Sequence, residues 1–354
     1  MLFLQGKKQL FNLAAMHRRL LFFLFLLMGC QRAPRQVNTS FYFWKTGFKL
    51  NPAEQKLLNQ LQPHKLYVRI MDVDLDENTR LPVPVSPVVF REKLPDSLAI
   101  VPVVFVVNDA LRNLNKAQLE KLSHQIIYFV NGKVKQAGKN SFEELQLDCD
   151  WTATTRNNYF YLLKNIKKQL KTDQVLSVTL RLHQLKNQLS AGIPPANRVM
   201  LMCYNMGNLR KYGRQNSILE VTELKKYAGD NLTAYPLPAD IGLPLFSWAV
   251  VFRNQQYAGI SKRLNYGLLQ NKSIFQQKNT NFYVLKTALP ALGLKQNDEI
   301  RWENVTADDL RAASNYLSRK MKPGPFNLLF FDLDGSVIKN YTYEELENIS
   351  RIFR

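Results

Sequence analysis

Three pairs of aspartates, each with a single residue between the two acids, follow apolar runs of the sequence. The pairs are Asp72 and Asp74, Asp148 and Asp150, and Asp332 and Asp334. Two carboxyl groups held a few ångströms apart can divide the acid and base roles of a hydrolysis reaction between them. Basic residues that could instead neutralise these acids are present at Lys45, Arg69, Arg156 and Arg181. The aspartate pairs therefore mark either a catalytic site or a structural network of ion pairs.

Histidine and cysteine are too scattered to predict a metal site. The four histidines are His17, His64, His124 and His183, and they show no HxxxH or HxH spacing. Cys149 and Cys203 lie in apolar runs, where a free cysteine behaves as a small buried hydrophobic residue. We expect neither a metal ion nor a cofactor, and we expect His183 to be packed and hydrogen-bonded rather than to act as a base.

Eight runs of β-type residues, most of them flanked by turn or cap residues, predict the strands that position these groups. They span 41–46, 65–72, 100–107, 145–151, 176–183, 198–205, 245–252 and 327–334. Amphipathic helices are predicted near 52–61, 115–129, 155–171, 216–228, 306–321 and 342–353. This alternation favours an α/β protein with a (β/α)8 TIM barrel over 40–354. A doubly wound open sheet is the alternative, although no glycine-rich phosphate loop follows the first strand.

Two segments are longer than a minimal barrel needs. Residues 73–97 contain four prolines and form a long excursion after the second strand. Residues 253–305 are too many for one loop and predict a β-rich subdomain inserted between strands seven and eight. Within it, 273–275 and 281–286 predict a hairpin that would wall the mouth of the barrel.

Strict alternation along three of the strands would point polar side chains into the barrel. The inward residues would be Gln146, Asp148 and Asp150; Ser177, Thr179, Arg181 and His183; and Met200, Met202 and Tyr204. Polar groups are costly in a barrel interior unless they pair with one another. They predict either an internal hydrogen-bond network or a ligand site at the carboxyl ends of the strands.

The N-terminal thirty residues have the order of an export signal. Basic residues at Lys7, Lys8, Arg18 and Arg19 precede the apolar run 20–28, which is too short to span a bilayer. The run ends in Gly29 and Cys30, which resembles a bacterial lipoprotein signal. That resemblance implies a signal peptide over 1–29, a lipid on Cys30, a tether over 30–39, and anchoring to a membrane of the bacterial cell envelope on its periplasmic or surface face. A start at Met16 would give a signal of more usual length, and an ordinary apolar segment followed by a chance Gly-Cys is the alternative.

The composition is that of a globular protein with an excess of positive charge. The 354 residues include 48 Lys and Arg against 28 Asp and Glu, a net charge of +20, and 46% are hydrophobic. The charge is spread along the chain without a run of five basic residues, and no nucleic-acid-binding module is recognisable. We therefore expect a bias toward anionic surfaces, membranes or glycans, and no nucleic-acid partner.

Two of the predicted strand ends resemble those of family-18 chitinase-like glycosidases. Residues 147–152 read LDCDWT and are similar to the family's DxDxE signature, which usually ends a strand as DxDWE. Residues 199–205 read VMLMCYN and resemble the family's sixth strand, which ends MxYD. Trp248 lies where a late strand of that family supplies a sugar-stacking tryptophan. The resemblance implies a barrel that acts on or binds an oligo- or polysaccharide.

Two residues depart from that pattern. Thr152 stands in the place of the family's catalytic acid, and Asn205 replaces the aspartate after tyrosine. In the family mechanism the acid protonates the bridging oxygen while a neighbouring aspartate orients the substrate's N-acetyl group. A threonine hydroxyl cannot supply that proton at useful pH, so the standard chitinase reaction is not expected.

Asp148 and Asp150 are the best candidates for catalysis if another pair of carboxyl groups does the work. Retaining glycosidases hold two carboxyl groups about 5–5.5 Å apart, and inverting ones about 6.5–9.5 Å apart. The candidate substrate-binding residues are Trp44, Trp151, Arg181, His183, Tyr204, Asn205, Trp248 and Asp332. Their tryptophan rings could stack on sugars or simply pack in the core. The alternative function is a non-catalytic glycan-binding or envelope assembly protein that has lost the catalytic acid.

The run FFDLDGSV at 330–337 resembles the first motif of haloacid-dehalogenase-type phosphatases, whose first aspartate is the nucleophile. Too few residues follow it to supply the lysine and the acidic metal ligands that such an enzyme needs downstream. We therefore interpret this run as the end of the eighth strand followed by a turn and a helix.

Overall fold

The computed structural model describes residues 35–261 and 263–354. The chain divides into two units, 1–35 and 36–354, and the second contains the whole of the fold described below. The predicted signal, Cys30 and the first part of the predicted tether, up to residue 34, lie outside the described residues. The end of the predicted tether is already part of the first strand, which begins at Val37. No helix of the described part is long and apolar enough to cross a membrane.

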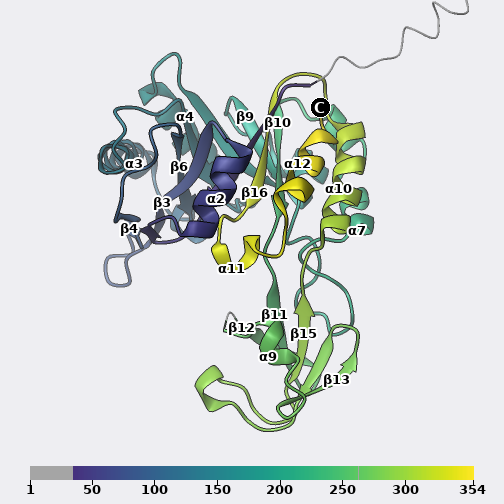
Figure 1. Ribbon diagram of the computed structural model, residues 1–354. Helices are drawn as coiled ribbons and strands as arrows, with labels where there is room; N and C mark the ends of the chain where they lie inside the picture. Colours follow the sequence, from purple (N-terminus) through teal and green to yellow (C-terminus); the bar gives the residue numbers. More distant parts are fainter. Residues whose placement is uncertain (1–34, 262) are drawn as a thin grey trace, which may run out of the picture. The chain divides into compact units, whose positions relative to one another are not determined.

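Eight parallel strands close into a barrel (Figure 1). In chain order they are β1 (Val37–Phe43), β3 (Lys65–Leu75), β6 (Ala99–Val106), β7 (Glu144–Asp148), β8 (Val175–Arg181), β9 (Arg198–Met202), β10 (Ala239–Pro244) and β16 (Phe326–Phe331). Each pairs with the next, β16 pairs with β1, and β1 pairs with β3 at Tyr42 opposite Tyr67. The closed ring confirms the predicted TIM barrel and excludes the open doubly wound sheet.

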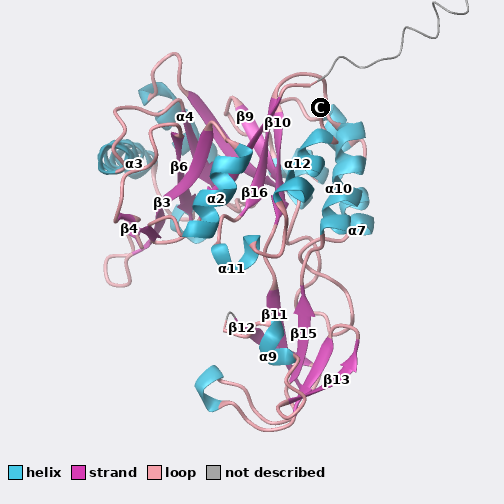
Figure 2. Cartoon of the chain, in the orientation of Figure 1, coloured by secondary structure: helices cyan, strands magenta, loops and turns pink. Residues whose placement is uncertain are grey.

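Helices cover the outside of the barrel (Figure 2). The longer ones are α2 (Pro52–Leu61), α3 (Lys116–Gln136), α4 (Arg156–Gln169), α7 (Val221–Ala228), α10 (Ala307–Lys320) and α12 (Tyr343–Arg351), close to the predicted ranges. Short helical segments are α5 (Leu182–Lys186), α6 (Gln188–Ala191), α8 (Asn231–Ala234) and α11 (Gly335–Ile338), with 3-10 turns at Asn108–Leu111 and Pro290–Leu292. Asn51, Asn115, Thr306 and Thr342 begin four helices with reciprocal capping boxes. These caps fix where each helix starts relative to the preceding strand or loop.

The predicted seventh strand is wrong. Residues 245–252 do not form it; the barrel strand is β10, which ends at Pro244, and Trp248 begins a strand of the inserted sheet. At the centre of β10, a Cβ on Gly242 would lie only 2.6 Å from the Met200 Sδ and 3.3 Å from the Tyr204 Cε1. Only glycine lets Met200 and Tyr204 fill the barrel at this level.

The insertion between β10 and β16 is a five-stranded antiparallel sheet. Its strands are β11 (Trp248–Arg253), β12 (Gln256–Ser261), β13 (Phe275–Asn279), β14 (Phe282–Leu285) and β15 (Glu299–Glu303), in the order β12-β11-β15-β14-β13, with the short helix α9 (Tyr266–Leu269). The predicted β-rich insertion is therefore present. β13 and β14 form a hairpin in the predicted region, but its first strand spans Phe275–Asn279, whereas the prediction of 273–275 ended that strand where it begins. Buried Arg301 and Glu303 bind this sheet to the loop after β9, through the Lys211 carbonyl and the Ser217 hydroxyl.

The proline-rich excursion after the second strand is also ordered. β3 continues to Leu75 and turns into the antiparallel strand β4 (Pro82–Val85). Beyond it, β5 (Val89–Phe90) pairs in parallel with β2 (Gly47–Phe48), which follows the first barrel strand. The excursion therefore packs over one side of the barrel.

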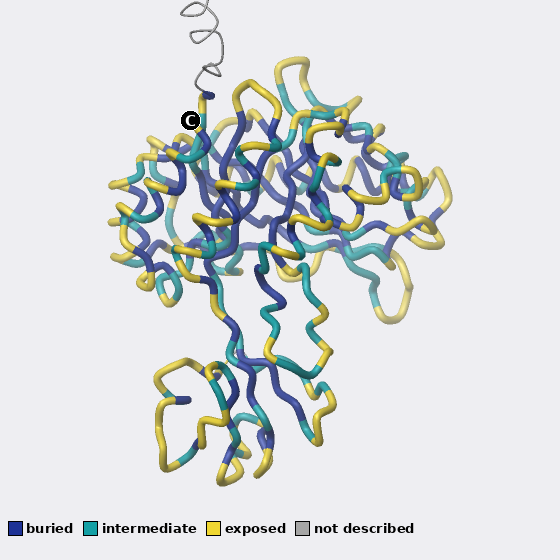
Figure 3. Tube along the Cα trace, turned by 90° about the vertical axis from the view of Figure 1, so that its right-hand side faces the viewer, coloured by how far each residue is buried: buried dark blue, intermediate teal, exposed yellow. Residues whose placement is uncertain are grey.

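Polar side chains fill the amino-terminal half of the barrel, which we call the floor. The Ser177 hydroxyl donates to Glu144 at 2.6 Å, and the Tyr67 hydroxyl donates to the other oxygen of the same carboxylate at 3.1 Å. Asp240 accepts from Arg198 and from the backbone and side chain of Asn327. Buried residues run along every barrel strand, while exposed ones lie on the loops and the outer faces of helices (Figure 3). Of the predicted inward polar residues, Gln146 and Ser177 belong to this network: the Gln146 amide accepts from Tyr42 and donates to Ser177 at 3.3 Å. Asp148, Asp150, Thr179 and Arg181 lie nearer the carboxyl ends of the strands, and His183 lies beyond its strand in α5.

Candidate functional site

Asp148 is the last residue of β7 and lies at the carboxyl ends of the strands, which we call the mouth. Its side chain is buried and accepts a hydrogen bond of 2.6 Å from the Thr179 Oγ1. Burial raises the pKa of Asp148 to about 7, although the Thr179 hydrogen bond opposes the shift; the charge of Asp150 raises it further. The carboxyl group therefore keeps its proton to a higher pH than an ordinary aspartate does.

Asp150 is held differently from Asp148. Its side chain is 45% exposed, and its Oδ1 lies 3.0 Å from the Nε of Arg181, the last residue of β8. The two predicted catalytic aspartates therefore share one region, but the more accessible one is already neutralised by an arginine.

Position 152 offers no side chain that could act as a general acid. The Thr152 hydroxyl lies 2.9 Å from the hydroxyl of Thr154 in an exposed turn before α4. The Thr152 backbone N–H donates to the Thr155 hydroxyl at 3.0 Å. The segment that carries an acid in the family pattern is here a hydroxyl-lined turn, and its groups stay neutral at useful pH.

The structure does not bring Trp151 to the mouth. Its ring is 1% exposed and stacks on Tyr159 of α4, with ring centroids 5.2 Å apart. Its indole N–H donates to the Ala191 carbonyl at 2.9 Å. The chain turns after Asp150, so this tryptophan packs between barrel and helices and is a core residue rather than a ligand contact.

Four half-buried aromatic rings form a continuous row across the mouth, which we call the aromatic ridge. The ring centroids of Trp44 and Phe331 are 5.4 Å apart, those of Phe331 and Phe246 are 5.8 Å apart, and those of Phe246 and Trp248 are 5.2 Å apart. Tyr204 stacks beneath Phe331 at 5.4 Å. Phe246 and Phe331 were not predicted as site residues; the signal that marks them is their position at the ends of β10 and β16.

Trp248 reaches the ridge from the insertion and not from a barrel strand. Its indole Nε1 donates to the Glu303 Oε2 at 2.9 Å, and the same oxygen accepts from the backbone N–H and hydroxyl of Ser217. The Arg301 Nε donates to the other Glu303 oxygen at 2.6 Å. This buried network orients the Trp248 ring.

Tyr204 and Asn205 lie just beyond β9, which ends at Met202. Burial raises the pKa of the Tyr204 phenol well above its usual value, and the neighbouring Asp148 adds to the shift, so the phenol stays protonated. Asn205 is exposed and has a left-handed backbone with φ of 53°, a conformation that asparagine tolerates better than most residues. Both residues lie at the mouth, with the amide of Asn205 open to solvent.

His183 lies in α5 rather than on the end of a strand. Partial burial lowers its pKa, and the positive charge of Arg181 lowers it further, against the opposing effect of Asp150. The imidazole is therefore neutral at neutral pH, where it can donate and accept hydrogen bonds.

The remaining acidic pairs enter local networks. Arg69 holds Asp72 through both carboxylate oxygens, and Asp334 caps α11 through Ser336. Asp332 is the exception: burial raises its pKa to about 6, and the charge of Asp334 adds to this effect. No group of three metal-ligating side chains converges within the described residues.

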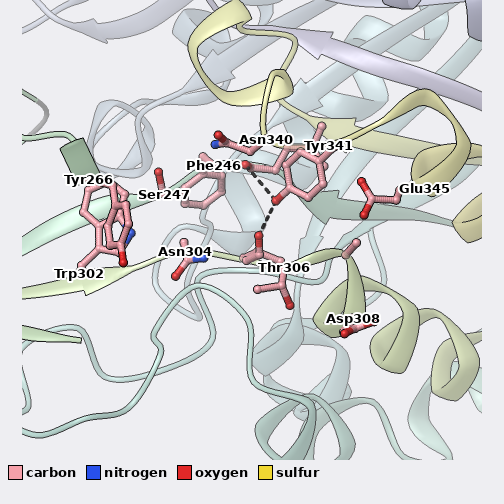
Figure 4. A pocket seen from close by; sticks show the side chains of 13 residues that line it. Phe246, Ser247, Tyr266, Trp302, Asn304, Thr306, Asp308, Asn340, Tyr341 and Glu345 are labelled. Atoms are coloured by element: carbon pink, nitrogen blue, oxygen red, sulfur yellow. Dashed lines mark hydrogen bonds between the residues drawn. The ribbon is translucent and has the colours of Figure 1, made fainter. Parts of the chain in front are cut away.

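A separate cavity of about 460 Å³ lies beside the ridge (Figure 4). Its walls come from the segment after β10, the return from the insertion into α10, and the loop between α11 and α12. Phe246 lines it and also belongs to the aromatic ridge. The Tyr341 hydroxyl closes its base by donating to the Val305 carbonyl at 2.6 Å.

The fold is similar to solved structures of chitinases and of a spore cortex-lytic enzyme. SleL of Bacillus cereus gives a TM-score of 0.56 at 12% identity, over 92% of this chain and 76% of that chain. A chitinase from Bacteroides thetaiotaomicron gives 0.54 at 11%, over 90% and 97%, and the GH18 chitinase ChiB of Flavobacterium johnsoniae gives 0.50 at 11%, over 90% and 94%. No family model and no curated protein matches the sequence. At these identities the likeness establishes the TIM-barrel fold and leaves the activity to the site itself.

Proposed function

We propose that the chain is a lipid-anchored protein of the bacterial cell envelope whose barrel mouth binds an oligo- or polysaccharide without cleaving it by the chitinase mechanism. One observation carries the proposal: the mouth combines a continuous aromatic ridge with a rim that lacks the required acid. Thr152 occupies the acid's position, and Arg181 neutralises Asp150. Sugar binding needs the aromatic ridge, which is present, whereas hydrolysis by the chitinase mechanism needs the acid that the rim lacks.

The ridge has the surface that a sugar chain requires. Trp44, Phe331, Phe246 and Trp248 are each only partly buried, so their rings are open to a ligand on one side. Flat apolar rings pack against the C–H faces of pyranoses, while convergent polar groups bind the hydroxyls. Asp150, Arg181 and Asn205 supply such polar groups at the mouth.

Hydrolysis by other carboxyl groups is a second candidate, favoured by the raised pKa values at the mouth. A general acid works best when its pKa lies near the working pH. Asp148, with a pKa of about 7, and Asp332, with one of about 6, keep protons that an ordinary aspartate loses. Asp148 is buried and already bonded to Thr179, which limits its access to a bridging oxygen.

Binding and release of sugar by the purified full chain in detergent would separate the two candidates. Chitin oligosaccharides and peptidoglycan fragments serve as probes, because the structural neighbours include chitinases and a cortex-lytic enzyme. We expect micromolar to millimolar binding and no new reducing ends from the wild type. Asp150→Asn should likewise release no sugar, while its binding weakens a few-fold. Asp230→Asn is the matched control, since Asp230 forms an exposed ion pair with Lys320 away from the mouth.

Release of sugar that Asp150→Asn abolishes and Asp230→Asn preserves would replace the binding function with a hydrolase. Neither binding nor release across the panel would overturn both candidates and leave the fold alone.

Anchoring is tested at Cys30. The proposal rests on the basic residues, the apolar run 20–28 and the Gly29-Cys30 pair of the sequence. We expect the mature protein to begin at a lipidated Cys30 and to sediment with membranes, and we expect Cys30→Ala to lose the lipid, as seen by mass spectrometry of the N-terminal peptide. A wild-type chain that keeps residues 1–29 and carries no lipid would contradict it.

A further inference from the structure

The cavity beside the ridge is lined like a saccharide site. Tyr266 and Trp302 stand at one end, with ring centroids 5.9 Å apart, and Tyr266 is 51% exposed (Figure 4). Its volume of about 460 Å³ lies within the range of 300–1,000 Å³ typical of small-molecule sites. Trp302 is partly buried and packs against the core of the insertion, while exposed Tyr266 lies beside it, so the pair can offer a ring face to a ligand at this end of the cavity.

Two amide side chains face the space between the ends of the cavity. Asn304 and Asn340 are exposed, and neither side chain has a hydrogen-bond partner among the described residues. The Ser247 hydroxyl also lines the wall. Unpartnered amides and hydroxyls can donate to and accept from neighbouring hydroxyls of one sugar ring, which is the pattern that sugars require.

The far end of the cavity is acidic. Asp308 and Glu345 lie there, away from the aromatic pair (Figure 4), and none of the described residues that line the cavity is basic. One oxygen of Glu345 accepts from the Thr342 backbone N–H at 2.7 Å, and Asp308 is paired with Arg311 on the outside of α10. The net charge of the lining favours neutral sugars or amino sugars and disfavours acidic ones.

Phe246 joins the cavity to the mouth. Its ring lines the cavity and lies 5.8 Å from Phe331 and 5.2 Å from Trp248 on the ridge. We propose that the cavity is an extension subsite, in which a glycan bound along the aromatic ridge continues past Phe246 and places a neutral or amino-sugar unit against Trp302, Asn304 and Asn340. This inference rests on the proposed glycan binding at the mouth and adds a length and charge preference to it.

Titration of the full chain in detergent with N-acetylglucosamine oligomers of two to six units tests the extension. We expect six units to bind about tenfold more tightly than three, because the longer chain reaches the second aromatic platform. Trp302→Ala should bring the six-unit affinity down to the three-unit value and leave the three-unit affinity unchanged. Asn340→Ala, which removes an exposed side chain without a protein partner, should weaken only the longer oligomers, by about three- to tenfold.

Matched controls keep a folding defect apart from a lost subsite. Tyr128→Ala removes an aromatic ring that is 84% exposed on α3, far along the chain from the cavity, and should change neither affinity. The unfolding midpoint of Asn340→Ala should equal that of the wild type. The fully deacetylated six-unit oligomer, which carries positive charges, should bind at least as tightly as the acetylated one.

Two failures have different meanings. If the three-unit oligomer does not bind at all, the proposed function of the mouth falls. The extension subsite is contradicted if the three-unit oligomer binds and the six-unit oligomer binds no more tightly. It is also contradicted if Trp302→Ala and Asn340→Ala leave the length dependence intact. Neither outcome contradicts glycan binding at the mouth.

Discussion

The floor and the mouth of the barrel are both lined by polar side chains, but the two regions hold them in opposite ways. At the floor, buried Asp240 accepts from Arg198 and twice from Asn327, so one carboxylate serves three donors. At the mouth, Asp148 has a single side-chain donor, and Asp150 is 45% exposed beside Arg181. Three donors offset the cost of burying the Asp240 carboxylate, whereas a carboxylate with fewer partners keeps lone pairs available to a ligand.

The aromatic residues repeat this contrast. Tyr42 and Tyr67 are fully buried, and their hydroxyls donate to Gln146 and Glu144 inside the barrel. Trp44, only two residues beyond Tyr42, is partly exposed and begins the aromatic ridge. β1 thus supplies a fully buried ring at Tyr42, and the segment just after it supplies a partly exposed ring at Trp44. The level along the barrel axis decides how far each ring is exposed.

Removing a floor carboxylate should give the largest effect on stability. Asp240→Ala leaves buried Asn327 and partly buried Arg198 without their acceptor, and we expect the free energy of unfolding to fall by about 3 kcal/mol. Urea unfolding followed by circular dichroism measures it. Asp230→Ala, which breaks an exposed pair with Lys320, should leave the midpoint unchanged. Equal stability of the two variants would remove the distinction between floor and surface.

The raised pKa of Asp148 at the mouth should make the free energy of unfolding depend on pH. The pKa of Asp148 is about 7 in the folded chain and near its ordinary value when unfolded, so the folded state binds the extra proton between about pH 4 and 7. Stability therefore falls as the pH rises through that window. Between low and high pH, the free energy of unfolding of Asp148→Asn should therefore fall by about 2–4 kcal/mol less than that of the wild type. The figure follows because one pKa unit corresponds to about 1.4 kcal/mol.

Urea midpoints of wild type and Asp148→Asn at pH 4.5, 6 and 8 measure the difference. Asp240 and Asp332, whose pKa values burial raises to about 6, contribute a fall of the same sign in both proteins and cancel in the comparison. Parallel pH curves for the two proteins would show that Asp148 ionises as an ordinary surface acid.

Some of this arrangement follows from the sequence and some does not. Strand alternation placed Ser177 and Thr179 inside the barrel, because the period of two is local information. The seventh strand was misplaced, because Ala239–Pro244 is short and contains Gly242 and Pro244, which carry weak β-propensity, while Trp248–Phe252 has the stronger pattern. Local propensity could not tell a barrel strand from a strand of the insertion.

The aromatic ridge forms only when the barrel closes, so the sequence alone could predict only part of it. Trp44 and Trp248 were candidates by residue type, but Phe331 and Phe246 join them only because β1, β10 and β16 become neighbours in the ring. Trp151 was placed at the mouth by proximity to the aspartates, whereas the turn after Asp150 directs its ring toward α4. Side-chain direction at a strand end is set by the turn that follows, which a motif does not encode.

The ridge should contribute to affinity more than to stability. Trp44→Ala removes a partly exposed ring at one end of the ridge, and we expect a loss of about tenfold in affinity for a three-unit N-acetylglucosamine oligomer. Isothermal titration of the full chain measures it. Tyr128→Ala, which removes an exposed ring on α3, should change nothing. Unaltered affinity in Trp44→Ala would assign the ring to packing alone.

The rim ion pair should have the smallest effect on folding. Asp150→Asn and Arg181→Gln each break a pair whose members keep access to water, so we expect each to cost less than about 1 kcal/mol of unfolding free energy. Each should still weaken oligosaccharide binding a few-fold, because the charged pair presents oriented donors and acceptors to sugar hydroxyls.

A double-mutant cycle on Asp150 and Arg181 sharpens the contrast with the floor. If the pair serves the ligand, its coupling energy appears in the binding measurement and nearly vanishes in the unfolding measurement. A coupling of several kcal/mol in unfolding would instead make this pair the equivalent of Asp240 and Arg198. The mouth would then be a continuation of the structural network, and ligand binding would depend on the aromatic ridge alone.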